Sequence, residues 1–188
     1  MTRRRATAIA SVLTAAIIAV VSLVYTQTQP FKLPELPAIT PGYYAITEVI
    51  DGDTIEVNMA GTRERVRMIG VDTPETKKPN APVQCFGPQA SEFAKATLSA
   101  KHVRLEADPT NDNRDRYGRL LRYVYLQDGS LFAEKLIASG HGFAYTSFPF
   151  QKAEAFTALQ HQAQTAKVGL WAACMPTFKE GRWQSNDL

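Results

Sequence analysis

Oxygen ligands for a hard metal ion occur in two short segments of this chain of 188 residues. Asp53 lies in the sequence DGDT, and Asp72 and Thr73 lie in the sequence DTPET. Two carboxylates, the Thr73 carbonyl and water molecules would form the oxygen-only coordination that calcium accepts. Pro74 fixes its own backbone and biases Thr73 toward an extended conformation, so this turn would keep one shape. The pattern predicts a calcium site, although DTPE alone is also compatible with a solvated acidic loop.

Other metal sites do not fit the sequence. An EF-hand loop that began at Asp51 would need an oxygen ligand at Ile55 and a glycine at Glu56. Zinc would need closely spaced histidines or cysteines, but the histidines are scattered and the two cysteines lie far apart.

Two arginines and a third carboxylate would complete a site for phosphoryl transfer. Arg67 lies five residues before Asp72, and Arg119 ends the sequence DRYGR. Two arginines directed at one oxyanion beside a metal ion would bind the phosphate and stabilise its developing charge. A carboxylate beside them would act as the base for an attacking water, and the same turn displays Glu75. The alternative for DRYGR is a tight turn with Gly118 at positive φ and its charges in solvent.

The net charge does not by itself indicate a nucleic-acid-binding surface. The chain carries a formal net charge of +3, but residues 42–188 contain 17 basic and 17 acidic residues. Attraction to phosphate would therefore be local. Basic residues do gather around the two segments: Arg63, Arg65, Arg67, Lys77, Lys78, Arg114, Arg116, Arg119 and Arg122.

The elements that would position these residues are mostly short strands. Alternation predicts strands over 43–50, 54–59, 102–107 and 119–126, and a central strand from Val66 into the DTPET turn. Asp51-Gly52 predicts a hairpin between the first two, which does not explain Asp53, a poor residue to start a strand. In the central strand, alternation would put Val66 and Met68 on one face and Arg67, Ile69 and Val71 on the other.

Helices are predicted over 88–98, 130–139 and 151–167. The fold class is thus mainly β with α. The order of elements suits a small, partly open, five-stranded barrel of the oligonucleotide-binding type (OB-fold), with three helices packed outside. We expect this domain to span residues 43–176 and a tail to span 177–188.

The N-terminal segment is of a different kind. Three arginines, residues 3–5, precede an uncharged run over 6–25, long enough at about 20 residues to cross a bilayer as a helix. We expect residues 1–26 to be a signal anchor or a signal peptide and the proline-rich residues 27–42 to be a linker. The arginines would stay in the cytoplasm. The prediction is a single-pass protein of the cell membrane with an extracytoplasmic domain; the alternatives are a secreted protein and, last, a buried helix.

Cys85 and Cys174 are the two cysteines of the chain. Outside the cytoplasm two such thiols more often pair than stay free, so we predict a disulfide that ties the chain end to the barrel. The alternative is two unpaired, buried thiols.

The ordered motifs DGDT, Arg67 before DTPET, and DRYGR before a strand resemble the thermonuclease family of staphylococcal nuclease-like (SNase-like) enzymes. The resemblance covers residues 43–171, including Phe86-Gly87-Pro88 and Gly169-Leu170-Trp171. It implies calcium-dependent cleavage of DNA and RNA, single-stranded or unstructured by preference, to 3′-phosphate and 5′-hydroxyl ends. The resemblance does not point to any protein partner. The alternatives are a non-catalytic nucleic-acid-binding module and a calcium-stabilised interaction domain of the cell surface.

The resemblance also implies roles for individual residues. Asp53, Asp72 and the Thr73 carbonyl would be calcium ligands, with Asp51 behind them. Glu75 would be the general base, and Arg67 and Arg119 would stabilise the transition state. Arg116 and Tyr117 would contact phosphate. Tyr145 would stack on a nucleotide, although Phe148 stands where some members have a second tyrosine, and a core or rim aromatic is the alternative.

Overall fold

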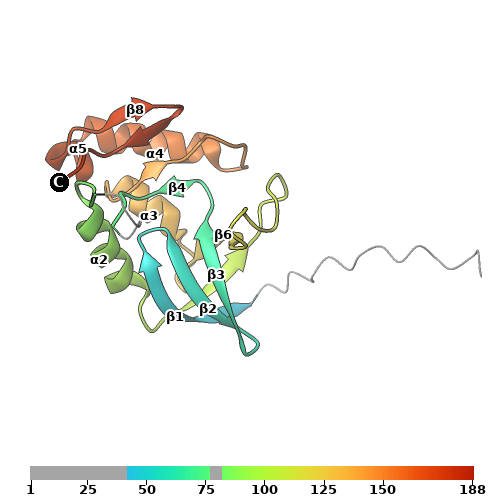
Figure 1. Ribbon diagram of the computed structural model, residues 1–188. Helices are drawn as coiled ribbons and strands as arrows, with labels where there is room; N and C mark the ends of the chain where they lie inside the picture. Colours follow the sequence, from blue (N-terminus) through green and yellow to red (C-terminus); the bar gives the residue numbers. More distant parts are fainter. Residues whose placement is uncertain (1–41, 77–81) are drawn as a thin grey trace, which may run out of the picture. The chain divides into compact units, whose positions relative to one another are not determined.

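The computed structural model describes residues 42–76 and 82–188 (Figure 1). The predicted N-terminal segment, the linker except Gly42, and the two lysines Lys77 and Lys78 lie outside the described residues. No helix within the described ranges combines the length and the apolar character needed to cross a membrane.

Five strands form a closed barrel in the order β1-β2-β3-β6-β5. They are β1 (Tyr43–Asp51), β2 (Thr54–Met59), β3 (Thr62–Met68), β5 (His102–Glu106) and β6 (Leu120–Tyr125). The sequence correctly predicted β1, β2, β5 and β6, placed the central strand too far along the chain, and indicated a partly open barrel. The barrel closes because the start of β1 pairs with β5, while β3 pairs in parallel with β6. Side chains such as Ile55, Val57 and Val66 are fully buried inside it.

The turn between β1 and β2 differs in detail from the prediction. Asp51 pairs with Thr54, so Gly52 and Asp53 are the two turn residues. Asp53 therefore does not start a strand, and the conflict with its low strand propensity disappears.

The central strand does not run on into the DTPET turn. β3 ends at Met68, Gly70 takes a φ of 75°, and β4 (Val71–Asp72) pairs with β7 (Phe143–Ala144) in a separate two-stranded sheet. The predicted alternation fails here, because the consecutive residues Met68 and Ile69, expected on opposite faces, are both buried. A Cβ at residue 70 would lie 2.5 Å from the Phe150 ring, so glycine permits both the turn and the close packing.

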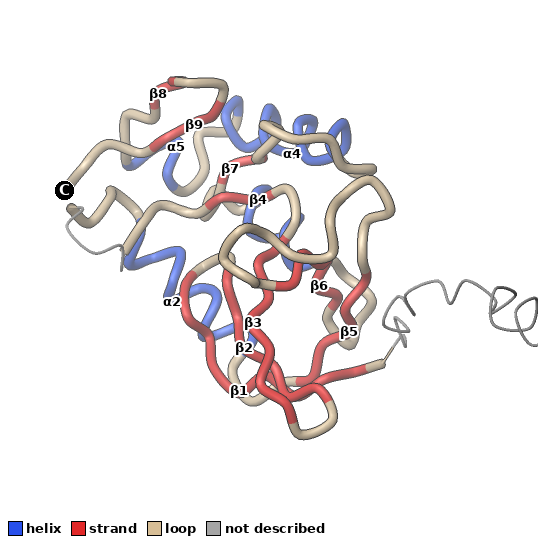
Figure 2. Tube along the Cα trace, turned by 45° about the vertical axis from the view of Figure 1, so that its right-hand side comes forward, coloured by secondary structure: helices blue, strands red, loops and turns tan. Residues whose placement is uncertain are grey.

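Within residues 42–76 and 82–188, four helices surround the sheets: α2 (Gly87–Leu98), α3 (Phe132–Ala138), α4 (Ala153–Thr165) and α5 (Leu170–Ala173). The first three are the predicted helices, and the short α5 is additional. α2 packs on β1, and α3 contacts both β6 and α4. Figure 2 shows β4 and β7 between the barrel and the region of α4 and α5.

The segment predicted to be a tail forms a hairpin instead. β8 (Thr177–Lys179) pairs with β9 (Arg182–Gln184), and both turn residues, Glu180 and Gly181, have positive φ. The hairpin lies beside α5 in both views (Figures 1 and 2). The prediction of a tail was wrong because Trp183 packs edge-on against Trp171 at 5.2 Å and so fixes the segment on the domain.

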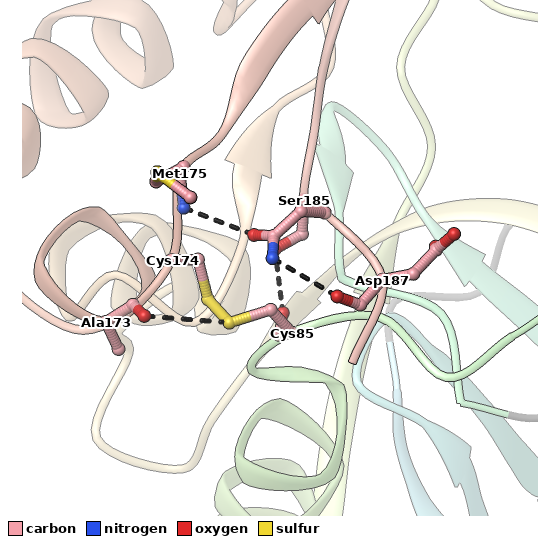
Figure 3. The surroundings of a disulfide bond; sticks show 7 residues. Cys85, Ala173, Cys174, Met175, Ser185 and Asp187 are labelled. Atoms are coloured by element: carbon pink, nitrogen blue, oxygen red, sulfur yellow. Dashed lines mark hydrogen bonds between the residues drawn. A yellow bond between two sulfur atoms is a disulfide. The ribbon is translucent and has the colours of Figure 1, made fainter.

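Cys85 and Cys174 form the disulfide expected from the sequence, with their Cα atoms 6.0 Å apart (Figure 3). The bond joins the segment before α2 to the end of α5 across 89 residues of sequence. The C-terminal segment, residues 185–188, runs alongside the disulfide, and the Ser185 hydroxyl donates to the Cys85 carbonyl at 2.8 Å.

Candidate active site

One cleft of about 930 Å³ brings together side chains from the β1–β2 turn, β3, the DTPET turn and the loop before β6. All the residues predicted for metal, phosphate and nucleotide binding line it: Asp53, Arg67, Asp72, Thr73, Glu75, Arg116, Tyr117, Arg119 and Tyr145. The grouping is a property of the fold, since these residues come from segments up to 92 positions apart in the sequence.

Arg67 is the most constrained side chain of the cleft. Its Nη2 lies 2.8 Å from Asp72 Oδ1 and 3.2 Å from Asp53 Oδ2. Its Nη1 donates to the carbonyls of Val71 at 2.6 Å and Met68 at 2.9 Å. Burial alone would lower the pKa of Arg67, but the two carboxylates raise it above its ordinary value. The guanidinium is therefore charged and held in one orientation.

Asp53 connects the β1–β2 turn to the DTPET turn. Its Oδ2 accepts from the Thr73 amide at 3.1 Å and from the Thr73 hydroxyl at 3.2 Å, and its Oδ1 accepts from Thr54 at 2.8 Å. The turns approach so closely that a Cβ at Gly52 would lie 2.7 Å from the Thr73 side chain. Gly52 thus permits the close approach of the two turns in the site as well as the hairpin turn itself.

The carboxylates of the cleft are crowded. Burial raises the pKa of Asp72 to about 6, against the opposing effect of Arg67. Burial also raises the pKa of Asp51 to about 6, and the charges of Asp53 and Glu75 add to this shift. A cation would relieve such crowding.

The donor set fits calcium by its chemistry. Asp53, Asp72 and the Thr73 carbonyl offer hard oxygen atoms and neither nitrogen nor sulfur. In the ranges that the structure describes, no group of three or more His, Cys, Asp or Glu side chains is arranged to hold a metal ion. A calcium ion here would therefore rely on two carboxylates, the backbone carbonyl and water.

Glu75 is positioned by residues on both sides of it. Its amide donates to Gln84 Oε1 at 2.9 Å, and its carbonyl accepts from the Gln84 amide at 2.9 Å. The Thr76 amide donates to Glu75 Oε1 at 3.0 Å, and the Thr76 hydroxyl donates to Asp51 at 3.1 Å. The acidic loop is thus fixed at its base rather than freely solvated.

The DRYGR segment is a tight turn, and it still presents Arg119 to the cleft. Asp115 Oδ1 accepts from the amides of Tyr117 at 2.9 Å and Arg119 at 3.0 Å, while Gly118 has a φ of 80°. Asp115 Oδ2 lies 2.7 Å from both Nε and Nη2 of Arg119. The segment is therefore the tight turn given as the alternative, and this turn also holds Arg119 at the cleft, where the phosphate-binding prediction requires it.

Three aromatic residues line the cleft: Tyr117, Tyr145 and Phe148. Tyr117 is 68% exposed, and the Arg116 guanidinium stacks over its ring at 4.8 Å. Tyr145 is partly buried, contacts Phe148 edge-on at 5.2 Å and donates its amide to the Gly70 carbonyl at 2.8 Å. Tyr117 is thus the more available surface for a base.

Sequence reasoning missed Arg182, which lines the same cleft. Its Nη1 lies 3.8 Å from Asp72 Oδ2. One signal in the sequence could have predicted this hairpin. Alternating residues flank Glu180-Gly181, and these two residues can form a two-residue hairpin turn.

The closed barrel and a cleft lined by carboxylates and arginines define an OB-fold protein with a site suited to phosphate chemistry. Comparison with known proteins agrees. Residues 65–173 match the model of the family described as "Staphylococcal nuclease homologue". The chain is 43% identical over 162 residues to the thermonuclease of Staphylococcus hyicus, covering 86% of this chain and 94% of that protein.

Two further relatives support the same assignment. The thermonuclease of Staphylococcus intermedius is 45% identical over 129 residues, 68% of this chain and 75% of that protein. Endonuclease YncB of Bacillus subtilis is 41% identical over 129 residues, 68% of this chain and 60% of that protein. The chain belongs to the staphylococcal nuclease-like family, and the resemblance seen in its motifs is confirmed. Its enzyme class is that of the hydrolases acting on phosphodiester bonds.

Proposed function

We propose that this protein is an exported, calcium-dependent nuclease that hydrolyses phosphodiester bonds of DNA and RNA. The observation that carries the proposal is the fixed Arg67 guanidinium between Asp53 and Asp72, in one cleft with Glu75 and Arg119. The names of the relatives, thermonucleases and an endonuclease, support it.

The two arginines would act on the phosphate. Two backbone carbonyls and two carboxylates already hold Arg67 in the cleft, so a phosphate would bind its remaining Nε–H or replace a carboxylate at Nη2. Arg119 would bind from the DRYGR turn, with Asp115 keeping its guanidinium in place. Both would stabilise the negative charge that grows on the phosphate oxygens as water attacks.

Glu75 would take a proton from the attacking water. The water oxygen bonds to phosphorus, the bond from phosphorus to the 5′ oxygen breaks, and that oxygen leaves with a proton from solvent. The products are a 3′-phosphate and a 5′-hydroxyl end. A positioned base of this kind contributes about 10²- to 10⁴-fold to the rate.

Asp53, Asp72 and the Thr73 carbonyl would hold calcium. When bound, the ion would polarise the phosphate and offset its charge. The exposed Tyr117 ring would favour single-stranded or unstructured substrates, whose bases are free to stack.

The test is to incubate the purified full chain with single- and double-stranded DNA and RNA, with calcium or with a chelator. We expect cleavage that requires calcium and is fastest on single strands. Binding without cleavage in the presence of calcium would support the non-catalytic alternative instead.

We also propose that residues 1–26 anchor the protein in the cell membrane with the nuclease domain outside. The supporting observations are three arginines before an uncharged run, and the disulfide, a bond usual outside the cytoplasm. The protein should fractionate with membranes and be digested by protease added outside. A mature N-terminus between residues 25 and 42, found in the medium, would support secretion instead.

A further inference from the structure

The C-terminal hairpin lies beyond residues 65–173, the part of the chain that matches the family model, yet it places a side chain in the cleft. We propose that Arg182 of β9 is a third phosphate-binding arginine, which holds a substrate phosphate next to the scissile one. This inference rests on the proposed nuclease function and adds a substrate-binding residue to it.

Arg182 and Arg67 face different oxygen atoms of the Asp72 carboxylate. Asp72 Oδ1 pairs with Arg67 at 2.8 Å, whereas Asp72 Oδ2 faces Arg182 at 3.8 Å. Arg67 would act on the scissile phosphate, so a second cation in the same cleft, at the other oxygen of Asp72, is placed for a neighbouring phosphate along the substrate strand.

The Arg182 guanidinium has N–H groups available to donate to a phosphate. Its side chain is 41% exposed, and within the described residues its long contact with Asp72 is the only ion pair or hydrogen bond recorded for it. A partly exposed pair at this distance contributes little to stability. A phosphate would offer the planar guanidinium two oxygen atoms in a geometry that it matches well.

Arg182 is nevertheless held in position by the hairpin. Side chains alternate along β9, so Trp183 points away from Arg182 and packs on Trp171 at 5.2 Å. Trp171 in turn contacts Phe143 at 5.3 Å, and Phe143 pairs with Asp72 between β7 and β4. A continuous row of aromatic contacts thus links the strand carrying Arg182 to the strand carrying Asp72.

The end of the chain fixes the hairpin a second time. The Cys85 amide donates to the Asn186 carbonyl at 2.7 Å, and Gln84 forms a β-bridge with Asp187. The Cys85–Cys174 disulfide lies next to this C-terminal segment (Figure 3). Gln84 is also the residue that binds both backbone groups of Glu75. The hairpin and the segment 185–188 are therefore connected through Gln84 to Glu75 of the cleft.

The test compares Arg182→Ala, Arg182→Gln and Arg182→Lys with the wild type at saturating calcium. Lys179→Ala is the matched control, because Lys179 pairs with Arg182 across the hairpin, is exposed and does not line the cleft. The substrates are a thymidine dinucleotide with one phosphodiester and a longer thymidine oligonucleotide with several. Thermal unfolding of each variant checks that it is folded.

For Arg182→Ala and Arg182→Gln we expect KM on the oligonucleotide to rise about tenfold, the effect of one charged hydrogen-bonded contact, with kcat nearly unchanged. On the dinucleotide, kcat/KM should stay at the wild-type value. Arg182→Lys should recover part of the loss, and Lys179→Ala should behave as wild type. The slope of log affinity for the oligonucleotide against log salt, measured in a Glu75→Gln background, should fall by about 0.7 without Arg182.

The failures of the two proposals can be told apart. A wild-type protein that cleaves neither substrate contradicts the nuclease function. A wild-type protein that cleaves, with Arg182 variants that keep its KM and salt slope, overturns the inference alone. Equal losses on both substrates, or a change only in the calcium requirement, would also overturn it, since Arg182 would then act on the scissile phosphate or on Asp72.

Discussion

Arg67 and Asp72 form a 2.8 Å ion pair inside the cleft. They lie five positions apart in the sequence, on either side of the turn at Gly70. The arginine proposed to bind phosphate and the carboxylate proposed to bind calcium thus neutralise each other when neither ligand is bound. Removing Arg67 leaves both Asp72 and Asp53 without the cation that they share, and only the long contact of Asp72 with Arg182 at 3.8 Å remains.

Arg67→Gln should therefore destabilise the protein in the presence of a chelator, by about 3 kcal/mol as for other buried pairs broken on one side. Calcium should restore more stability to this variant than to the wild type, because the ion would replace the lost positive charge. Thermal unfolding with chelator and with calcium measures both effects. Equal stabilisation of the two proteins by calcium would contradict the shared site.

Asp53→Asn should raise the calcium concentration needed for half-maximal cleavage, and added calcium should recover part of the rate. The reason is that a neutral amide replaces one of two carboxylate ligands. Cleavage rates over a calcium titration measure this. An unchanged calcium requirement, with only the maximal rate reduced, would assign Asp53 to holding Thr73 and Arg67 rather than the metal.

Glu75→Gln should keep the fold and lower kcat by about 10²- to 10⁴-fold, because glutamine can still accept the Thr76 hydrogen bond but cannot take a proton. Glu48→Gln, on the exposed side of β1 and away from the cleft, is the control and should keep full activity. Steady-state kinetics at saturating calcium separate the two variants. A Glu75→Gln enzyme with wild-type kcat would remove Glu75 from the mechanism.

The disulfide should contribute about 4 kcal/mol to the free energy of unfolding, because it closes a loop of 89 residues in the unfolded chain. Cys85→Ser with Cys174→Ser should unfold at lower temperature and be insensitive to reductant, while the wild type should lose stability when reduced. Thiol labelling of the unreduced, denatured wild type should modify no cysteine. Two labelled cysteines would rule out the bond.

Acid should weaken the domain through Asp108, which lies away from the proposed metal ligands. Burial opposes its charge, but hydrogen bonds from Thr110, Tyr123 and the Gln151 amide bring its pKa down from 3.8 to about 2. The charged form is thus favoured by folding, so this stabilisation is complete above pH 3.8 and is lost as pH falls toward 2.

Asp108→Asn should therefore be less stable than wild type at neutral pH and should show a smaller loss of stability between pH 4 and pH 2. Urea unfolding across this range measures the difference, with Asp112→Asn, an exposed neighbour, as the control. Parallel pH profiles of Asp108→Asn and wild type would contradict the assignment.

Local signals in the sequence were sufficient for the barrel strands and for most of the cleft. Alternation located most of the strands, and the motifs containing Asp53, Arg67, Asp72 and Arg119 predicted side chains that do line one cleft. Each of these signals lies within a few residues, where strand periodicity and turn chemistry determine the backbone.

Other features depend on contacts between distant residues. Gly70 breaks the central strand because it packs against Phe150, and β4 exists because β7 pairs with it. Arg182 reaches the cleft because Trp183 packs on Trp171, a contact that periodicity in one segment does not reveal. Barrel closure likewise depends on the pairing of β1 with β5.

Hydrolysis of a single-stranded DNA oligonucleotide in ¹⁸O-labelled water, with calcium, tests the central claim most directly. The proposed attack of water on phosphorus predicts 3′-phosphate products that carry the label, 5′-hydroxyl ends that lack it, and no products when calcium is chelated. Products with 5′-phosphate ends, or cleavage that continues in the chelator, would contradict this account of the cleft.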